Sequence, residues 1–252
     1  MPNIVHVTLR DPESAGPAQR PLRPSIYPPL VLSHKATRIP STFSMPIVEL
    51  VFGPTPEAFQ ANPADPALVK PAYDGILKQD GAIKAYYGLK SEDSSIAYGF
   101  YVWESLEHHQ KFMNNKAEYQ PVLDAVSVMF DLSRLTMVHI KTSVEPYAAL
   151  EAPLLEVATC TLHPGRSIEE LESVLNKLVD IANTDKSPIS PVLATSGRVV
   201  ENEHTMMFLV GWPSDQAHAQ WFETTPRAAE LSDQLHQIAE LDTIDTVQTL
   251  YY

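Results

Sequence analysis

The chain carries an internal repeat in which glycine, tryptophan, histidine and aromatic positions recur at one fixed spacing. The first copy holds Gly88, Trp103, His109 and Phe112, and the counterparts lie 109 positions later at Gly197, Trp212, His218 and Trp221. Self-similarity at a fixed period indicates one folded unit present twice. A chain of 252 residues can hold two such units, each large enough to bury a core. We therefore predict a first repeat over 45–144 and a second over 153–252.

Each repeat shows the same order of strand and helix patterns. A strand rich in β-branched residues opens each copy, and a helix, a hairpin, two more helices and a closing strand follow. The opening strands are expected at 46–52 and 153–159, the hairpin strands at 83–90, 96–103, 192–199 and 205–210, and the closing strands at 135–141 and 244–250. The predicted order is β-α-β-β-α-α-β, twice.

The first helix differs between the two repeats. In the second repeat Ser167 precedes Glu170 by three residues, which is the pattern of a capping box, and apolar residues follow at helical spacing. The corresponding segment after Asp65 is interrupted by Pro71 and Gly75. Because proline removes a backbone donor and glycine weakens a helix, we expect a short or kinked helix there.

This order of elements gives a four-stranded antiparallel sheet with its helices on one face. The strand at 96–103 has no polar alternate row, so the other face of its sheet must also be covered. Two such sheets meeting face to face would bury both surfaces. The predicted fold class is therefore α+β, built from two ferredoxin-like repeats.

A short motif links this pattern to a known superfamily. Trp103 ends a strand, Ser105 follows it, and His109 lies on the next helix. Together with the β-α-β-β-α-α-β order, this motif resembles the dimeric α+β barrel superfamily, and it is most similar to the antibiotic-biosynthesis-type monooxygenases. The likeness covers about 45–252. It implies a barrel that is normally built from two chains but is formed here within one.

Composition excludes several partners. The net charge of −13 disfavours nucleic acid and anionic membranes, which both require clustered basic residues. No apolar run approaches the ~20 residues that cross a bilayer. The single cysteine, Cys160, cannot form an internal disulfide, so we expect a reducing, cytoplasmic setting and a core position for this residue.

The segment 1–44 differs from the rest of the chain. It holds eight prolines and five basic residues against two acidic ones. Dense proline prevents a helix or sheet ladder from propagating, and the apolar residues are too few for a core. We expect a disordered tail or residues upstream of the true start at Met45, with a targeting segment as the alternative.

The interior of such a barrel is the expected pocket, with apolar walls and a few polar groups. Glu49 lies mid-strand among apolar residues, and Glu156 holds the matching place in the second repeat. A buried carboxylate has a raised pKa and can act as a general base or acid. His139, in the closing strand, is expected to lie beside Glu49, whereas the second repeat has Gln248 at the equivalent position. The alternative is that the carboxylates face solvent or pair with a cation.

Two further residues complete the candidate catalytic set. His109 shares a helix face with Phe112, and the resemblance implies that such a histidine works with a tyrosine in the cavity. Tyr87 is the tyrosine selected, as a hydroxyl donor, with His109 as a secondary acid. The alternative is that His109 is a boundary residue that caps a partner, and that Trp103 and Trp212 serve packing alone.

No metal or cofactor is expected. His108 and His109 are adjacent on a helix and cannot chelate one ion together. No paired-cysteine spacing and no glycine-rich phosphate loop occurs. Haem-degrading relatives use an axial histidine, for which only His139 or His163 would serve, and haem is disfavoured.

The resemblance implies a small apolar, aromatic or polyketide-like ligand, changed without a cofactor by a monooxygenase or cyclase reaction. The alternative is a non-catalytic stress-response or ligand-carrier barrel, and in either case two fused barrels could pair as a homodimer. A cavity of bicyclic size lined by Glu49 and His139 would favour the enzyme. A barrel interior filled by large side chains would favour the carrier.

Overall fold

The computed structural model describes residues 45–63 and 65–251. The predicted disordered tail, 1–44, lies outside the described residues. Among the described residues no helix has both the length and the apolar composition needed to cross a membrane.

The predicted α+β order of elements is confirmed in both halves of the described chain. The first half contains β1 (Ile47–Pro54), α1 (Glu57–Ala61), α2 (Pro66–Leu77), β2 (Ala82–Leu89), β3 (Ile96–Trp103), α3 (Leu106–Asn114), α4 (Lys116–Val126), a 3-10 turn (Leu132–Arg134) and β4 (Thr136–Thr142). After α5 (Tyr147–Leu150), the second half contains β5 (Leu154–Leu162), α6 (Ile168–Thr184), β6 (Leu193–Val199), β7 (Thr205–Trp212), α7 (Asp215–Thr224), α8 (Pro226–Ile238), β8 (Ala239–Thr246) and β9 (Thr249–Tyr251).

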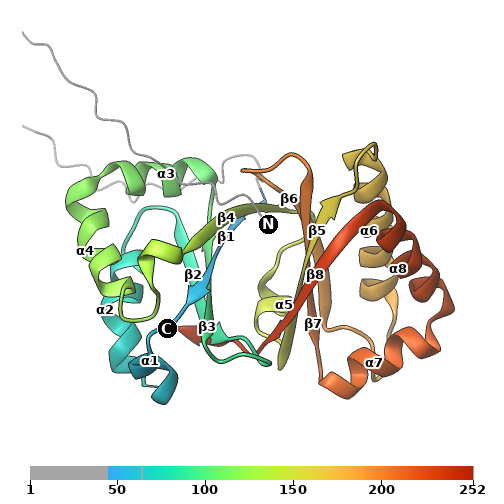
Figure 1. Cartoon of the computed structure of the whole chain (residues 1–252), viewed down its shortest axis with the longest axis horizontal. Helices are drawn as coiled ribbons and strands as arrows, with labels where there is room; N and C mark the ends of the chain where they lie inside the picture. Colours follow the sequence, from blue (N-terminus) through green and yellow to red (C-terminus); the bar gives the residue numbers. More distant parts are fainter. Residues whose placement is uncertain (1–44, 64, 252) are drawn as a thin grey trace, which may run out of the picture. The chain divides into compact units, whose positions relative to one another are not determined.

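The strands form one curled antiparallel sheet rather than two separate sheets. Its strand order is β8-β5-β7-β6-β4-β1-β3-β2-β9. The two halves are joined where β4 pairs with β6 and where β9 pairs with β2. Pairing between the halves satisfies backbone groups that would otherwise lie open at the sheet edges. Figure 1 shows the helices of the two halves on opposite sides of these strands.

The closing strand of the second half differs from its prediction as one strand at 244–250. It begins earlier, as β8, and is interrupted at Val247 and Gln248 before β9. The interruption marks a change of partner, since β8 pairs with β5 in its own half and β9 pairs with β2 in the first half. The two edge strands are thus consecutive in the chain, and the backbone bridge Lys90–Thr246 joins the end of β8 to the residue that follows β2.

Three hydrophobic clusters hold these layers together. One lies between the sheet and the helices of the first half, and a second lies at the corresponding place in the second half. The third fills the inner face of the curled sheet with side chains from both halves, including Val48, Leu50, Tyr86, Phe100, Leu155, Met207 and Leu209, and Ala149 and Leu150 of α5. The prediction that each sheet buries its second face against the other half is therefore confirmed.

Helices α2 and α6, which hold corresponding places in the two halves, differ as expected. Helix α2 is 12 residues long and continues through Pro71, whereas α6 has 17 residues. At the start of α6 the Ser167 hydroxyl accepts from the Glu170 amide, and the Glu170 carboxylate accepts from the Ser167 amide. The predicted capping box is confirmed.

Replacing this cap should destabilise the protein measurably. The change Ser167→Ala leaves the Glu170 amide without its acceptor and is expected to cost about 1 kcal/mol in free energy of unfolding. Urea denaturation followed by circular dichroism measures this cost, with Ser91→Ala in an exposed turn as the control. Equal stability of the two variants would show that the capping box contributes nothing.

Candidate functional site

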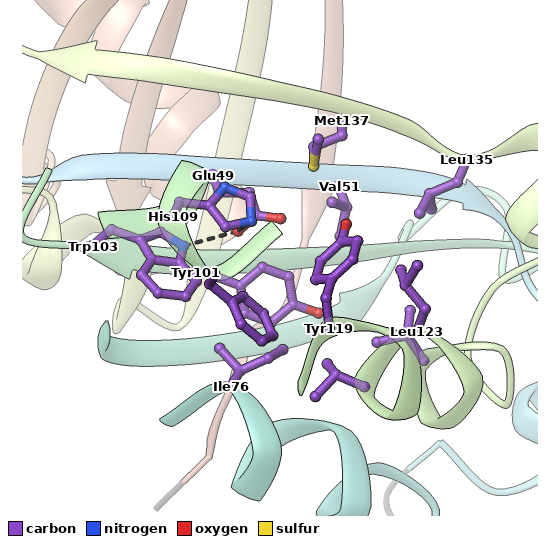
Figure 2. Close-up of a pocket in the computed structure, with 13 residues that line it drawn as sticks. Glu49, Val51, Ile76, Tyr101, Trp103, His109, Tyr119, Leu123, Leu135 and Met137 are labelled. Carbon is purple, nitrogen blue, oxygen red and sulfur yellow. Dashed lines mark hydrogen bonds and ion pairs between the residues drawn. The ribbon is translucent and has the colours of Figure 1, made fainter. Parts of the chain in front are cut away.

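The candidate pocket lies between the sheet and the helices of the first half, so the prediction of a pocket in the barrel interior is wrong. Successive side chains of a strand point to opposite faces. Val48 and Leu50 belong to the cluster that fills the interior, and Glu49 between them faces the helices instead. Figure 2 shows Glu49 in this space between β1 and the helices.

The pocket is small and largely apolar. Its lining is Glu49, Val51, Ile76, Tyr101, Trp103, His109, Phe112, Tyr119, Val122, Leu123, Val126, Leu135 and Met137. Its volume is about 40 Å³, which is room for about three water molecules. This pocket does not meet the criterion that would favour an enzyme, because it is too small for a bicyclic ligand and Glu49 lines it without His139.

Glu49 is held from two sides. The Trp103 ring nitrogen donates to Glu49 Oε2 at 2.8 Å, and His109 Nε2 lies 3.4 Å from the same oxygen. The Trp103 and His109 rings stack with centroids 4.7 Å apart. Helix α3 begins directly after β3, so the end of the strand and the start of the helix bring both rings to one carboxylate. Trp103 therefore does more than pack, because it positions the carboxylate.

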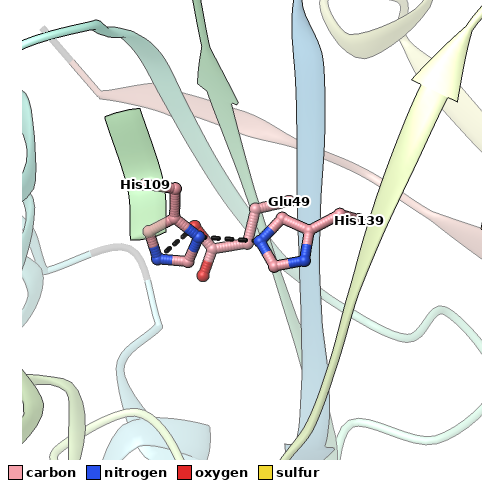
Figure 3. Close-up of side chains that lie close together, drawn as sticks. All are labelled: Glu49, His109 and His139. Carbon is pink, nitrogen blue, oxygen red and sulfur yellow. Dashed lines mark hydrogen bonds and ion pairs between the residues drawn. The ribbon is translucent and has the colours of Figure 1, made fainter. Parts of the chain in front are cut away.

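A hydrogen-bonded chain continues from His109 away from the pocket. His109 Nδ1 lies 2.7 Å from His139 Nε2, and His139 Nδ1 lies 2.5 Å from Glu201 Oε1. Figure 3 shows Glu49, His109 and His139. The His139 amide also donates to the second oxygen of Glu201 at 2.8 Å. Glu201 comes from the turn between β6 and β7, so a side chain of the second half completes the site of the first.

Burial sets the protonation of the inner groups. Desolvation raises the pKa of Glu49 to about 7, although the charge of His139 and the Trp103 hydrogen bond oppose the rise. Desolvation, together with the charge of His139, lowers the pKa of His109 to about 3, so this ring is neutral near pH 7. Burial alone would raise the pKa of Glu201, but its bonds to His139 outweigh burial and lower it. Glu49 is therefore poised to exchange a proton near neutral pH.

The raised pKa of Glu49 predicts a pH-dependent stability. The folded protein holds the Glu49 proton more tightly than the unfolded chain, so the stabilisation is complete below pH 4.5 and is lost as the pH rises through about 7. At pH 8 the Glu49→Gln variant should therefore be more stable than the parent, with a free energy of unfolding about 3 kcal/mol higher. Near pH 4 this difference should vanish. Guanidinium titrations at both pH values measure this, with Glu223→Gln at an exposed position as the control.

The second half repeats the inner part of this arrangement. The Trp212 ring nitrogen donates to Glu156 Oε2 at 2.8 Å, and His218 Nε2 lies 3.4 Å from that oxygen. The side chain of His218 is 29% exposed, whereas that of His109 is 2% exposed. The second carboxylate is thus held in the same way but nearer to solvent.

The residue that corresponds to His139 is Asp245, not Gln248. Glu49 is paired in register with His139 across β1 and β4, and Glu156 is paired with Asp245 across β5 and β8. The prediction of Gln248 assumed a constant spacing of 109 residues, but the chain between the helix and the closing strand is three residues shorter in the second half. In the part of the chain that the structure describes, this site has two neighbouring imidazoles in the first half and one imidazole beside an aspartate in the second.

Of the other residues predicted from the sequence, His139 lies at the site and Tyr87 lies outside the pocket. The prediction that His139 lies beside Glu49 is confirmed by the strand register. Tyr87 packs against Tyr73 and Phe59 and does not line the pocket, whereas Tyr101 and Tyr119 do. Cys160 is buried in the core of the second half, as predicted.

Sequence reasoning missed Glu201. Its position in a polar turn is typical of a solvated residue, and nothing local indicates a contact 62 residues away with His139. The only available signal was its acidic counterpart Glu92 in the matching turn of the first half.

The site contains the residue types of a metal centre but not its usual geometry. Glu49, His109 and His139 each offer a ligand atom within 4.8 Å of the others. The two nitrogens of His109, however, point to different partners, Glu49 and His139, so the ring lies between them instead of facing a shared centre. A haem group does not fit this pocket, because the pocket has room for only a few water molecules.

Comparison with solved structures identifies the fold. A candidate monooxygenase from Fusobacterium nucleatum matches with a TM-score of 0.62 at 9% identity, covering 83% of this chain and 95% of that one. A candidate monooxygenase from Lactobacillus acidophilus matches with a TM-score of 0.57 at 12% identity, covering 82% and 95%. An anthrone oxidase-like protein matches with a TM-score of 0.54 at 10% identity, covering 83% and 92%. No protein-family model and no curated protein matches by sequence.

These matches extend over both halves, since each covers more than four fifths of the chain. The curled nine-stranded sheet with helices on its outer faces is the dimeric α+β barrel fold, as the sequence predicted. At these identities the likeness establishes the fold, and chemistry must be argued from the site itself.

Proposed function

We propose that the protein binds a small aromatic or polyketide-like molecule in the pocket of the first half and oxygenates it with dioxygen, without a cofactor. The observation that carries this proposal is Glu49, a buried carboxylate that lines an aromatic pocket and is fixed there by Trp103 and His109. A fixed carboxylate with a pKa near the working pH is suited to general base catalysis. The names of the three similar structures support an oxygenase.

The substrate class follows from what Glu49 can deprotonate. A CH₂ group that a carbonyl activates, either directly or through an aromatic ring, is acidic enough, because the resulting carbanion is delocalised onto the carbonyl oxygen. Glu49 removes one proton, the carbanion gives its electrons to dioxygen, and a returned proton completes a hydroperoxide. Loss of water then leaves a ketone, so R₂CH₂ and O₂ become R₂C=O and H₂O. Carbon is oxidised by four electrons and dioxygen is reduced by four.

Substrate binding requires the pocket to widen. Helix α4 supplies part of the wall through Tyr119, Val122 and Leu123, and it contains Pro121. Proline removes one backbone hydrogen bond from a helix, so α4 is weakened within the stretch that forms this wall. We infer that α4 shifts outward when the ligand enters.

The proposal is tested with purified full-length protein and anthrone, a linear 1,3-diketone and a hydroquinone, followed by an oxygen electrode. We expect one dioxygen consumed per ketone formed from an activated CH₂ substrate, with one ¹⁸O atom from ¹⁸O₂ in the product. The rate should survive dialysis against a chelator. A rate that returns only with added metal would overturn the cofactor-independent mechanism.

The second candidate is a non-catalytic ligand carrier. The filled barrel interior and the small pocket favour it, because neither provides ready space for turnover. A carrier would bind the same aromatic molecules, detected by quenching of tryptophan fluorescence, and would release them unchanged. Binding without dioxygen uptake across the panel would select this alternative.

A further inference from the structure

The hydrogen-bonded chain behind Glu49 leads from the closed pocket to the protein surface. The side chains of Glu49, His109 and His139 are 8%, 2% and 3% exposed, whereas that of Glu201 is 28% exposed. Glu49 and His109 are within ion-pair distance at 3.4 Å, and hydrogen bonds of 2.7 and 2.5 Å join His109 to His139 and His139 to Glu201. A proton released in the pocket therefore has a continuous route to water that does not pass through the ligand.

The hydrogen bonds allow only a few placements of the protons. At rest, the hydrogen shared by His139 Nδ1 and Glu201 lies on the ring, because the bonds of Glu201 to His139 lower the pKa of that carboxyl. At 2.7 Å, one of the facing nitrogens of His109 and His139 must also carry hydrogen. With three protons on Glu49 and the two rings, three arrangements satisfy every contact. The one with a His109 imidazolium is disfavoured, because burial lowers the pKa of that ring to about 3. Two arrangements remain. In one, Glu49 is protonated and both rings are neutral, and in the other Glu49 is charged and His139 is an imidazolium.

We propose that His109, His139 and Glu201 form a proton relay that carries the proton taken up by Glu49 to solvent, with Glu201 of the second half as its outer end. The inference rests on the proposed function, for which it supplies the route of the proton. His139 and Glu201 are relay residues and not catalytic ones, since neither lines the pocket and both act on substrate only through Glu49, whereas His109 lines the pocket and links it to the rest of the relay.

The relay balances at each step. Substrate gives a proton to Glu49. Glu49 passes a proton to His109 Nε2 as His109 Nδ1 releases one to His139 Nε2, which leaves Glu49 charged and His139 an imidazolium beside the Glu201 carboxylate. His139 Nδ1 then gives its proton to Glu201, which releases it to water. Return of a proton to the peroxide runs the same steps backward and restores the original positions of the ring protons.

The second half provides a natural comparison. The Val200 amide donates to the His139 carbonyl, and the Ser91 amide donates to the Asp245 carbonyl, so the two turns dock on the two closing strands in the same way. Glu92 is therefore the counterpart of Glu201, but its charge helps to raise the pKa of the Asp245 carboxyl, whereas Glu201 contacts an imidazole. The relay is thus specific to the first half, and Glu92 is the matched control position.

Kinetics of Glu201→Gln test the relay in the intact protein. The variant keeps the size of the side chain but loses the proton acceptor, so kcat should fall about 10- to 100-fold. KM should stay unchanged, because Glu201 does not line the pocket. Added acetate should restore part of kcat by accepting the proton of His139, and Glu201→Asp should retain more activity than the glutamine variant. Glu92→Gln should behave as the parent protein does.

An NMR measurement tests the relay independently of activity. Protein labelled with ¹⁵N-histidine should show His139 protonated at Nδ1, and Glu201→Gln should shift the ring nitrogens of His109, which Glu201 does not contact. Shifts confined to His139 would overturn the relay, as would an unchanged kcat in an active protein. If no substrate is oxygenated but the His109 shift occurs, the proposed function fails and the proton connection survives.

Discussion

Glu49→Gln is expected to lower kcat at least 100-fold while the protein remains folded. Glutamine preserves the acceptor for the Trp103 ring nitrogen but cannot take a proton, and general base catalysis contributes about 10²- to 10⁴-fold. In the parent protein kcat should rise with pH through about 7, since only the ionised carboxylate is a base. The variant should lose this dependence. Steady-state dioxygen uptake from pH 5 to pH 9 measures both effects.

Glu156→Gln is the control for this result. Glu156 accepts from a tryptophan and lies beside a histidine with the same distances, but it belongs to the second half. The Glu156→Gln variant should therefore have a kcat within about twofold of that of the parent protein. Equal loss in the two variants would show that the effect is structural or that both halves react, and full activity of Glu49→Gln would remove Glu49 from the mechanism.

Phe100→Ala is expected to destabilise the protein by about 3–5 kcal/mol. Phe100 has no exposed surface and belongs to the cluster inside the curled sheet, where it is paired in register with Leu50 and Tyr86. Removing its ring leaves a void that side chains of both halves border. Guanidinium unfolding followed by tryptophan fluorescence measures the loss.

Val192→Ala at a 49% exposed position is the control, and it should change the free energy of unfolding by less than about 0.5 kcal/mol. A similarly small change for Phe100→Ala would mean that the barrel interior is loosely packed or hydrated. The interior would then again be a candidate ligand site. A large loss identifies it as the core that holds the halves together.

The secondary structure could be predicted because its signals are local. The capping box of Ser167 and Glu170 and the step from Trp103 into α3 both depend on residues a few positions apart. The position of the pocket could not be predicted in this way. Alternation shows that Glu49 and Val48 face opposite ways, but only the assembled sheet shows which face meets helices and which meets the other half.

Contacts between the halves were beyond sequence reasoning for a related reason. The division of the closing strand into β8 and β9 depends on an edge of the first half, which no pattern near 239–251 encodes. The replacement of His139 by Asp245 was hidden by a small change in loop length. The contact between Glu201 and His139 depends on the pairing of β4 with β6, because this pairing brings the turn that carries Glu201 next to His139.

His139 and Asp245 occupy matched positions in a single polypeptide, and this has a genetic consequence. In a barrel assembled from two identical chains, every mutation appears at both sites, so a change that harms one harms both. One gene that encodes both sites is free of that restriction. Mutations can refine the buried site around Glu49 while the more exposed one around Glu156 is altered, lost or adapted to another task.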